Sequence, residues 1–574
     1  MARTGYPSKY GPVLIFNERR VSSNDWSDPD DFAGTDTVRY YVDSAASDDS
    51  ANGLTDSTPK KTLAAGLALL QAGAIAVPGR PDQLLLKRGS TFTDQTLGFM
   101  TTTGAIGGAA LSGRSMTQRV VIGTYGTGER PKIRGGSLQL PPITTGSLEL
   151  KNFAVLGIDF DNYLYPAGNG ASRCIECHGP SDYVLVEDCL FRRAQTSILG
   201  YFASWQKNWT VRRNVFLEQL QGEWIKLGKA DGWLIEENHF DGTENLSWST
   251  ILVRAGIEGD TACWSKNVFV IGNTFSNFPT HAVYLPAGAV VRDNVIFLGA
   301  RGIQVGNRYE GINPGFSGVI GGVVCEIVGN YISDLMDLPA SVNPTPYVGG
   351  RAIYVANTMS GGLVEDNIIT RCTATQPYAL YIDGAGTTSG GFQAPCLDLS
   401  IRRNKVYRWW RTPNPYHYKG IFIGGNNQTG QPPDIGNVAF KNNDIQEPAG
   451  SMSLLVHFDN TLATSGEIDS ARNRFFRTGQ LNDRYSPTGF GSTDIAGYRL
   501  AMADADSVET QVPYPDPDKT IADYHASIGG TATVAAYVAA VRAQSRYTTG
   551  GASGWNDDLM ASKVLDYMRA NFSA

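Results

Sequence analysis

Short apolar stretches recur along most of this chain, and each shows the same order of apolar and polar positions. The order is apolar, any residue, apolar, two polar residues, Asn, any residue, apolar, as in residues 209–216 (WTVRRNVF) and 233–240 (WLIEENHF). Alternation over three to five positions is typical of a β-strand, and the polar break indicates a turn. The pattern is marked by Asp188 in the place of Asn, and then by Asn214, Asn238, Asn273, Asn294, Asn330, Asn367, Asn404, Asn443 and Asn473.

The markers lie 21 to 39 residues apart, which indicates a fixed turn with loops of variable length rather than a helical repeat. One such unit cannot bury its apolar face, whereas stacked units bury a continuous core. The sequence therefore predicts an all-β fold, a right-handed parallel β-helix of about ten coils, on the order of 50 Å long at ~4.8 Å per coil. Because Asn tolerates the left-handed conformation, we expect it at the turn, with its amides stacked into a ladder.

A second short strand aligns in successive units, from 225–227 (IKL) to 421–423 (IFI) and 454–456 (LLV). Its flanking residues should point inward and its middle residue outward. Four aromatics in one exposed column would suit stacking on sugar rings, although loops that cover and pack them are the alternative interpretation. The predicted outward column is Lys226, Leu252, Tyr284, Gln304, Tyr354, Tyr381 and Phe422.

The pattern divides the chain into three parts. Residues 1–37 are polar and turn-rich, which predicts an arm or linker, and residues 38–510 form the β-helix. Thr62 to Ala76 is rich in Ala and Leu, which predicts a helix that covers the open N-terminal end of the solenoid. Residues 511–574 begin with spaced prolines and continue with Ala-rich stretches at 532–546 and 557–572, which predict a small helical segment.

Composition narrows the classes of function. The chain has 574 residues, 65 of them Gly, and a net charge of −7 with few basic runs, which argues against nucleic acid as a partner. We expect no membrane insertion, since no apolar run approaches 18 residues, and Met1–Arg20 lacks the apolar core of a secretion signal. Seven Cys do not indicate a disulfide scaffold.

We expect no cofactor. Cys174–His178 (CIECH) has the spacing of a c-type haem attachment motif, but it fits a strand with Ile175 and Cys177 inward and Glu176 in the outward column. No second Cys/His pair has the spacing of a zinc site. Calcium is a weak prediction that depends on the acidic turn residues Asp43, Asp48, Asp49 and Asp56.

Charged residues and long loops gather around the predicted column between about residues 223 and 420, where they could wall a groove. An anionic sugar chain would find cations there. The charged residues just before the second strand are Glu223, His281, Arg301, Arg351 and Lys419; those just after it are Arg254 and Asp383; those on the long loops are Glu258, Asp260, Arg308 and Glu310.

Two mechanisms fit these residues. A β-eliminating lyase needs a base, for which His281 or Lys226 is a candidate, an acid such as Tyr284, and a cation such as Arg301. A glycosidase needs two carboxyl groups, which Glu223, Glu258, Asp260, Glu310 and Asp383 could supply. We expect Lys226, Arg254, Gln304, Arg351, Tyr354, Tyr381 and Phe422 to bind substrate. For each residue, a solvated charge or a salt bridge is the competing interpretation.

The N-terminal third resembles the opening of many right-handed β-helix carbohydrate-active proteins, a group that includes pectate-lyase-like enzymes and bacteriophage tailspike depolymerases. The resemblance depends on 40–44 (YYVDS), 53–62 (GLTDSTPKKT), 85–89 (LLKRG) and 122–131 (IGTYGTGERP), and with the Asn-marked coils it extends over residues 38–480. An arm without a secretion signal favours a tailspike. The arginine-centred signature of pectate lyases is not evident, which argues against pectate chemistry.

The resemblance implies a homotrimer on a virion tail that binds and cleaves a bacterial surface polysaccharide, such as O-antigen or capsule, by elimination or hydrolysis. A non-catalytic glycan-binding adhesin and a secreted polysaccharide lyase are the alternatives, because this fold serves many reactions.

Overall fold

The computed structural model describes most of the chain, in separate ranges. The described residues are 26–99, 111–134, 141–144, 149–161, 173–218, 223–242, 251–253, 266–278, 280–285, 289–305, 325–337, 350–356, 361–374, 377–383, 396–410, 419–424, 435–448, 454–458, 467–478, 485–486, 493–548 and 554–573.

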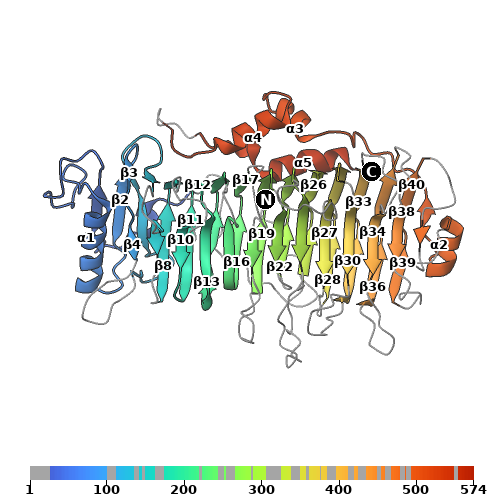
Figure 1. The fold of residues 1–574 in the computed structure, drawn as a ribbon, viewed down its shortest axis with the longest axis horizontal. Helices are drawn as coiled ribbons and strands as arrows, with labels where there is room; N and C mark the ends of the chain where they lie inside the picture. Colours follow the sequence, from blue (N-terminus) through green and yellow to red (C-terminus); the bar gives the residue numbers. More distant parts are fainter. Residues whose placement is uncertain are drawn as a thin grey trace.

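Each coil contributes three short strands, and equivalent strands of successive coils pair in parallel to form three long faces (Figure 1). In chain order within a coil we call the faces sheet 1, sheet 2 and sheet 3. Sheet 1 comprises β1 (Arg39–Val42), β2 (Gln83–Lys87), β5 (Val120–Tyr125), β8 (Leu150–Leu156), β11 (Ser181–Glu187), β14 (Thr210–Arg212), the end of β16 (Ile225–Glu236), β19 (Lys266–Ile271), β22 (Ala289–Arg292), β25 (Cys325–Val328), β28 (Gly362–Glu365), β32 (Leu399–Arg402), β36 (Val438–Lys441) and β39 (Ile468–Ala471).

Sheet 2 is the face that follows the ladder position. It comprises β3 (Thr91–Thr93), β6 (Lys132–Arg134), β9 (Asp159–Asp161), β12 (Leu190–Arg192), β15 (Val215–Leu217), β17 (His239–Asp241), β20 (Thr274–Ser276), β23 (Val295–Phe297), β26 (Tyr331–Leu335), β29 (Ile368–Cys372), β33 (Lys405–Trp410), β37 (Asp444–Glu447), β40 (Arg474–Arg477) and β42 (Val508–Glu509).

Sheet 3 carries the predicted outward column. It comprises β4 (Gly98–Phe99), β7 (Ile143–Thr144), β10 (Arg173–Cys177), β13 (Thr196–Lys207), the start of β16, β18 (Ile251–Val253), β21 (His281–Leu285), β24 (Arg301–Val305), β27 (Arg351–Ala356), β30 (Tyr378–Asp383), β34 (Lys419–Gly424), β38 (Leu454–Phe458) and β41 (Tyr485–Ser486). A separate pair, β31 (Cys396–Leu397) and β35 (Ile435–Gly436), lies outside the three faces.

The predicted right-handed parallel β-helix is confirmed, but it is longer than expected. Sheet 2 alone has 14 strands among the described residues, so its ends are on the order of 60 Å apart at ~4.8 Å per strand. The prediction of about ten coils was too low because coils before residue 189 carry no Asn marker. Phenylalanines at one inward position, from Phe160 to Phe275, stack with ring centroids 4.6–5.2 Å apart and fill the core beneath sheet 2.

The amide ladder is confirmed, with two corrections. The backbone N–H and Nδ2 of Asn294 donate to Asn330 Oδ1 at 3.0 and 2.9 Å, and the same bonds repeat from Asn214 to Asn473. The first position of the ladder is occupied by Cys189 and not by Asp188, since the Cys189 N–H donates to Asn214 Oδ1. The left-handed residue is the one before the ladder residue, as at Asp188 before Cys189 and at Arg213 before Asn214, because the ladder residue itself points into the core.

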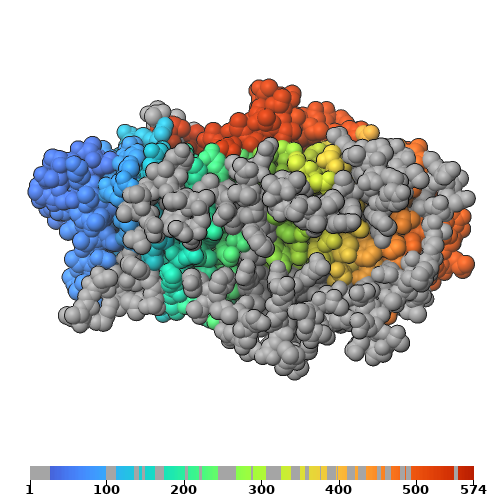
Figure 2. Space-filling model, in the orientation of Figure 1, coloured from blue at the N-terminus to red at the C-terminus, as the bar shows by residue number. Residues whose placement is uncertain are grey.

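Helices lie at the ends and along one side of the rod. Helix α1 (Leu63–Ala76), with Thr62 as its N-cap, packs on β1 and β2 at the N-terminal end as predicted, and α2 (Ile495–Met502) packs on β39 and β41 at the other end. In Figure 1, α3 (Ile521–Ser527), α4 (Val534–Arg542) and α5 (Ala561–Asn571) lie along sheet 2, and in Figure 2 they form a ridge. No helix in the described part of the chain has the length and apolar character needed to cross a bilayer.

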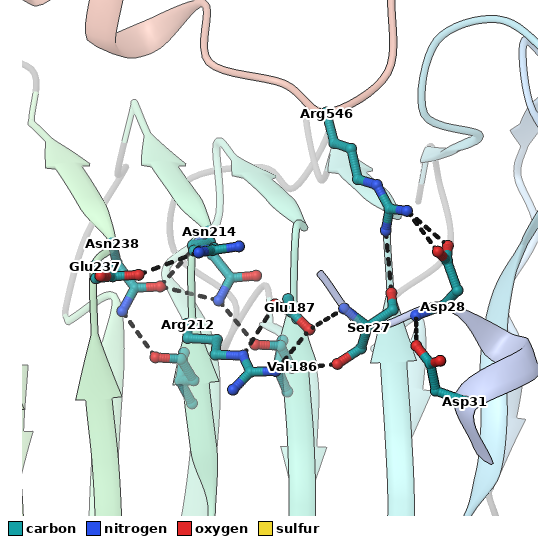
Figure 3. Close-up of polar contacts among 12 residues, drawn as sticks. Ser27, Asp28, Asp31, Val186, Glu187, Arg212, Asn214, Glu237, Asn238 and Arg546 are labelled. Carbon is teal, nitrogen blue, oxygen red and sulfur yellow. Dashed lines mark hydrogen bonds and ion pairs between the residues drawn. The ribbon is translucent and has the colours of Figure 1, made fainter. Parts of the chain in front are cut away.

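The C-terminal segment is held by a second core and by ion pairs. Its apolar side chains pack on outward residues of sheet 2, such as Phe297 and Tyr331. The described end of the N-terminal arm is fixed at the same place. Arg546 donates to both carboxylate oxygens of Asp28, at 2.8 and 2.7 Å, and to the Ser27 carbonyl (Figure 3). Phe32, at the end of the short 3-10 helix η1 (Pro29–Phe32), then packs on sheet 1.

Candidate functional site

Sheet 3 is the face that carries the candidate site. The C-terminal helices pack on sheet 2 and the N-terminal arm on sheet 1, and among the described residues neither contact uses the column of sheet 3. The strand registers confirm that the predicted column residues share one position. Its members in order are Phe99, Thr144, Glu176, Leu199, Lys226, Leu252, Tyr284, Gln304, Tyr354, Tyr381, Phe422, His457 and Ser486.

The prediction that this column is exposed was wrong for part of its length. Gln304 is 5% exposed and Tyr354 is 2% exposed, while Tyr284, Tyr381 and Phe422 are partly buried. One reason is that neighbouring rings cover one another. Tyr381 and Phe422 stack with centroids 4.6 Å apart, and Phe422 and His457 follow at 5.4 Å. The faces of these rings therefore meet each other.

His281, Tyr284 and Arg301 lie together. His281 and Tyr284 are on β21, and their rings stack with centroids 5.4 Å apart. Arg301, the register partner of His281 on β24, places Nη1 3.1 Å from His281 Nε2. A guanidinium can only donate, so Nε2 is the acceptor and the imidazole in this arrangement is neutral, with its proton on Nδ1. The sequence placed His281 and Arg301 just before the second strand of their coils and Tyr284 in the column, and the structure brings their side chains into contact.

A second group lies on the next two coils. The Arg351 guanidinium lies over the rings of Tyr354 and Tyr381, with its central carbon 4.8 and 4.2 Å from their centroids. The Tyr354 hydroxyl donates to Asp383 Oδ2 at 3.1 Å. Arg351, Tyr354, Tyr381 and Asp383 were all predicted, so this part of the site is also brought together. The group brings a cation, a carboxylate and phenol rings next to one another.

Two further groups lie toward the N-terminal end of the column. Glu223, only 2% exposed, forms an ion pair with Lys226, whose Nζ lies 3.1 Å from Oε2. Glu176 is 4% exposed and pairs with Arg173 and with His178 Nε2, the latter at 3.1 Å. These buried carboxylates are thus neutralised by Arg173 and Lys226, which for Glu223 is the salt-bridge interpretation.

The strand registers of sheet 3 also show that two of the candidate carboxylates lie far apart. Glu223 lies on the coil of Lys226, and Asp383 on the coil of Tyr381, five strands further along sheet 3. At ~4.8 Å per strand these carboxylates are about 24 Å apart, whereas a glycosidase pair needs roughly 5–9.5 Å. Glu223 and Asp383 therefore cannot act together on one glycosidic bond. The candidates Arg254, Glu258, Asp260, Arg308 and Glu310 lie outside the described residues, as does the side chain of Lys419.

Two of the acidic turn residues proposed for calcium, Asp43 and Asp49, bind groups of the protein itself. Asp43 pairs with Lys87 at 2.6 Å, and Asp49 accepts from the backbone N–H and hydroxyl of Thr62, where α1 begins. In the described ranges, no three His, Cys, Asp or Glu side chains converge on a place for a metal ion. Cys174 and Cys177 are buried in the core, and burial raises the pKa of the Cys174 thiol well above its usual value.

Sequence reasoning missed Tyr378 and His457. Tyr378 is the register partner of Arg351 and its ring contacts Tyr381 at 4.9 Å. The sequence did contain a signal for Tyr378: it precedes the column residue Tyr381 by three positions, just as His281 precedes the column residue Tyr284. His457 was missed because the last strand was aligned as 454–456, whereas Val456 pairs with Ile421 and His457 with Phe422.

Comparisons with known proteins assign no family to this chain. No protein-family model matches the sequence, and no curated protein matches it. The surface adhesin PfbA of Streptococcus pneumoniae is a similar solved structure, with a TM-score of 0.41 and 13% identity, over 72% of this chain and 87% of that chain.

Two more solved structures are similar to a comparable degree. A mannuronic acid specific polysaccharide family 6 lyase from human gut microbiota has a TM-score of 0.39 and 12% identity, over 83% of this chain and 92% of that one. A tailspike protein of E. coli bacteriophage HK620, in complex with a pentasaccharide, has a TM-score of 0.37 and 11% identity, over 75% and 76%. By the register of its own strands, this chain is a right-handed parallel β-helix protein.

Proposed function

We propose that this protein binds an acidic bacterial surface polysaccharide along sheet 3 and cleaves it by β-elimination. The observation that carries the proposal is the contact between Arg301 and His281 Nε2 at 3.1 Å, beside the stacked ring of Tyr284. These are the three groups that elimination from a uronate needs: a cation for the carboxylate, a base and an acid.

The geometry suggests how binding would start the reaction. When a uronate carboxylate takes the Arg301 guanidinium, the His281 Nε2 lone pair is released next to the sugar. Nε2 then removes the C5 proton, and Arg301 stabilises the negative charge that spreads onto the carboxylate. The C4–O bond breaks as the C4–C5 double bond forms, and the Tyr284 hydroxyl protonates the departing oxygen. Proton transfer from the imidazolium to the tyrosinate restores both groups.

A depolymerisation assay tests this proposal. The protein is incubated with capsule and lipopolysaccharide preparations, while polymer size and the ultraviolet absorbance of unsaturated uronate ends are followed. We expect shorter polymer with new absorbance, and a loss of at least about 100-fold in rate for His281→Ala and for Tyr284→Phe, the lower end of the usual contribution of general acid–base catalysis. Tyr567→Phe, on α5, is the matched control. Full activity in both site variants would refute the assigned roles.

Two alternatives are separated by the same assay. Shorter polymer with new reducing ends but no absorbance change would indicate hydrolysis. Retained binding with unchanged polymer size would indicate a non-catalytic adhesin, which the row of Tyr381, Phe422 and His457 favours because it supplies contact surface without chemistry.

A tailspike-type depolymerase on a virion tail is part of this proposal, as is a homotrimer; secretion as a free lyase is the alternative. The polar arm ahead of the β-helix supports the tailspike assignment as a point of attachment. Light scattering on the full chain measures the assembly: a mass three times the monomer's 61.9 kDa is expected, and a monomer would contradict the trimer.

A further inference from the structure

Arg351 is held by aromatic rings on three sides. Its guanidinium carbon lies 4.2 Å from the ring centroid of Tyr381, 4.8 Å from that of Tyr354 and 5.9 Å from that of Tyr378. Burial raises the pKa of the Tyr378 hydroxyl, and the nearby Arg351 charge opposes that rise. Cation–π contacts of this kind fix the plane of a guanidinium while its N–H edge stays able to donate.

Among the described residues, Arg351 has no carboxylate within ion-pair distance. Several arginines elsewhere in the described coils do have one, as Arg371 has Asp334 and Arg402 has Glu365. The carboxylate of Asp383, in the same group, accepts from the Tyr354 hydroxyl. The rings thus hold a positive charge in place without neutralising it, which is the electrostatic requirement of an anion receptor.

Arg351 also has a defined position relative to the proposed reaction centre. It is the register partner of Arg301 on the adjacent strand of sheet 3, so the two backbones are ~4.8 Å apart. Successive strands of sheet 3 are therefore spaced by about the length of one pyranose unit. A polysaccharide that runs parallel to the rod axis would place one sugar at Arg301 and its neighbour at Arg351.

We infer that Arg351, in its cage of three tyrosines, is a carboxylate-binding subsite for the sugar next to the one that is cleaved. The substrate class is accordingly a polysaccharide with acidic sugars at consecutive positions, aligned with the rod axis. This inference rests on the proposed function for the position of the cleaved sugar. The subsite acts in binding and in selection by charge, and it takes no part in proton transfer.

Binding measurements on the full chain in a His281→Ala background test the inference without turnover. The probes are oligomannuronate and oligogalacturonate, which carry a carboxylate on every sugar, and hyaluronan oligosaccharides, which carry one on every second sugar. Each probe is compared with its carboxyl-reduced, neutral form, and dextran sulfate tests for charge without carboxylate. Isothermal titration gives the affinity for Arg351→Gln and for Arg351→Lys, which keeps the charge.

We expect at least one fully acidic probe to bind more tightly than hyaluronan and than its own reduced form. Arg351→Gln should weaken that binding by about 10- to 100-fold, the usual range for a lost charge-assisted hydrogen bond, and leave binding of the reduced form unchanged. Arg351→Lys should recover part of the loss, which separates charge recognition from a folding defect.

Three outcomes would overturn the inference: no acidic probe preferred over its reduced form, equal losses for both forms in Arg351→Gln, or equal Arg351-dependent binding of dextran sulfate. Its failure is distinguishable from failure of the proposed function. If the protein cleaves polymer but shows no Arg351-dependent preference for charge, the subsite is refuted and the enzymatic function still stands. If the protein cleaves no polymer but shows an Arg351-dependent preference for acidic oligosaccharides, the subsite still stands and the enzymatic function is refuted.

Discussion

The amide ladder offers the sharpest test of what stabilises this rod. We consider Asn294→Ala, in the middle of the ladder. The Asn294 side chain accepts from the Asn273 backbone N–H at 2.9 Å and donates to the Val270 carbonyl at 3.0 Å and to Asn330 Oδ1 at 2.9 Å. Asn273 Nδ2 keeps its bond to the Ile235 carbonyl, so the Asn273 N–H is the group that is left buried without its partner.

The expected cost follows from these bonds. An orphaned buried N–H costs about 1–3 kcal/mol. Each of the two hydrogens that Asn294 Nδ2 donates, which also reach the Arg292 carbonyl at 2.9 Å, contributes about 1 kcal/mol. The sum is a loss of about 3–5 kcal/mol in the free energy of unfolding. Cys189→Ala is the matched control, because Cys189 occupies the same ladder position, is equally buried, and makes only weak thiol contacts at 3.4 and 3.8 Å.

Guanidinium unfolding followed by tryptophan fluorescence measures the difference, and unfolding rates replace equilibrium midpoints where refolding is incomplete. We expect Cys189→Ala to cost about 1 kcal/mol, at the low end for a small change in a core. If Asn294→Ala is no more destabilising than Cys189→Ala, the ladder hydrogen bonds do not stabilise the rod.

Three more results are expected from the contacts around the C-terminal segment. Arg546→Ala removes both bonds to Asp28, so limited proteolysis should cut the N-terminal arm several times faster than in wild type; an unchanged rate would contradict the clamp. Burial lowers the pKa of His239 from 6.5 to about 3. The folded state therefore keeps this imidazole neutral between pH 6.5 and 3, where the unfolded chain would protonate it. The free energy of unfolding should fall by ~1.4 kcal/mol per pH unit as the pH drops from 6.5 toward 3. His239→Phe should flatten this part of the stability–pH curve, and an unchanged slope would refute the assignment. Asp188→Ala strands the buried Arg130 and should cost about 3–5 kcal/mol, whereas adding Arg130→Met should restore much of the loss; equal loss in the double variant would count against an uncompensated charge.

The residue pattern alone was enough for the fold and for much of the site's arrangement. Period-two alternation, the Asn interval and the second strand predict parallel coils, because each coil must repeat the same inward positions to continue one core. The same repeat placed His281, Arg301 and Arg351 at equivalent positions, just before the second strand of their coils. The strand registers agree with that alignment, since His281 pairs with Arg301 and Arg301 with Arg351. A signal of this kind is local in sequence, so it can be read without any tertiary information.

Other features depended on contacts between distant parts of the chain. The one-residue slip at Asp188 arose because charge at a turn resembles Asn in sequence, whereas only the ladder bond to Asn214 identifies Cys189 as the inward residue. The burial of Tyr354, the mutual stacking of Tyr381 and Phe422, and the covering of sheet 2 by the C-terminal helices are likewise not visible in any single repeat.

The physical reason is the same in each case. A repeat determines which side of a strand a residue occupies, because that depends only on the alternation of the backbone. Exposure, ring faces and ion-pair partners depend on what neighbouring coils and terminal segments place above that side. The sequence therefore determined the rod, its ladder and the line of candidate residues, while only the tertiary structure decided which of them meet, which are covered, and that Arg351 lies in an aromatic cage without a carboxylate partner among the described residues.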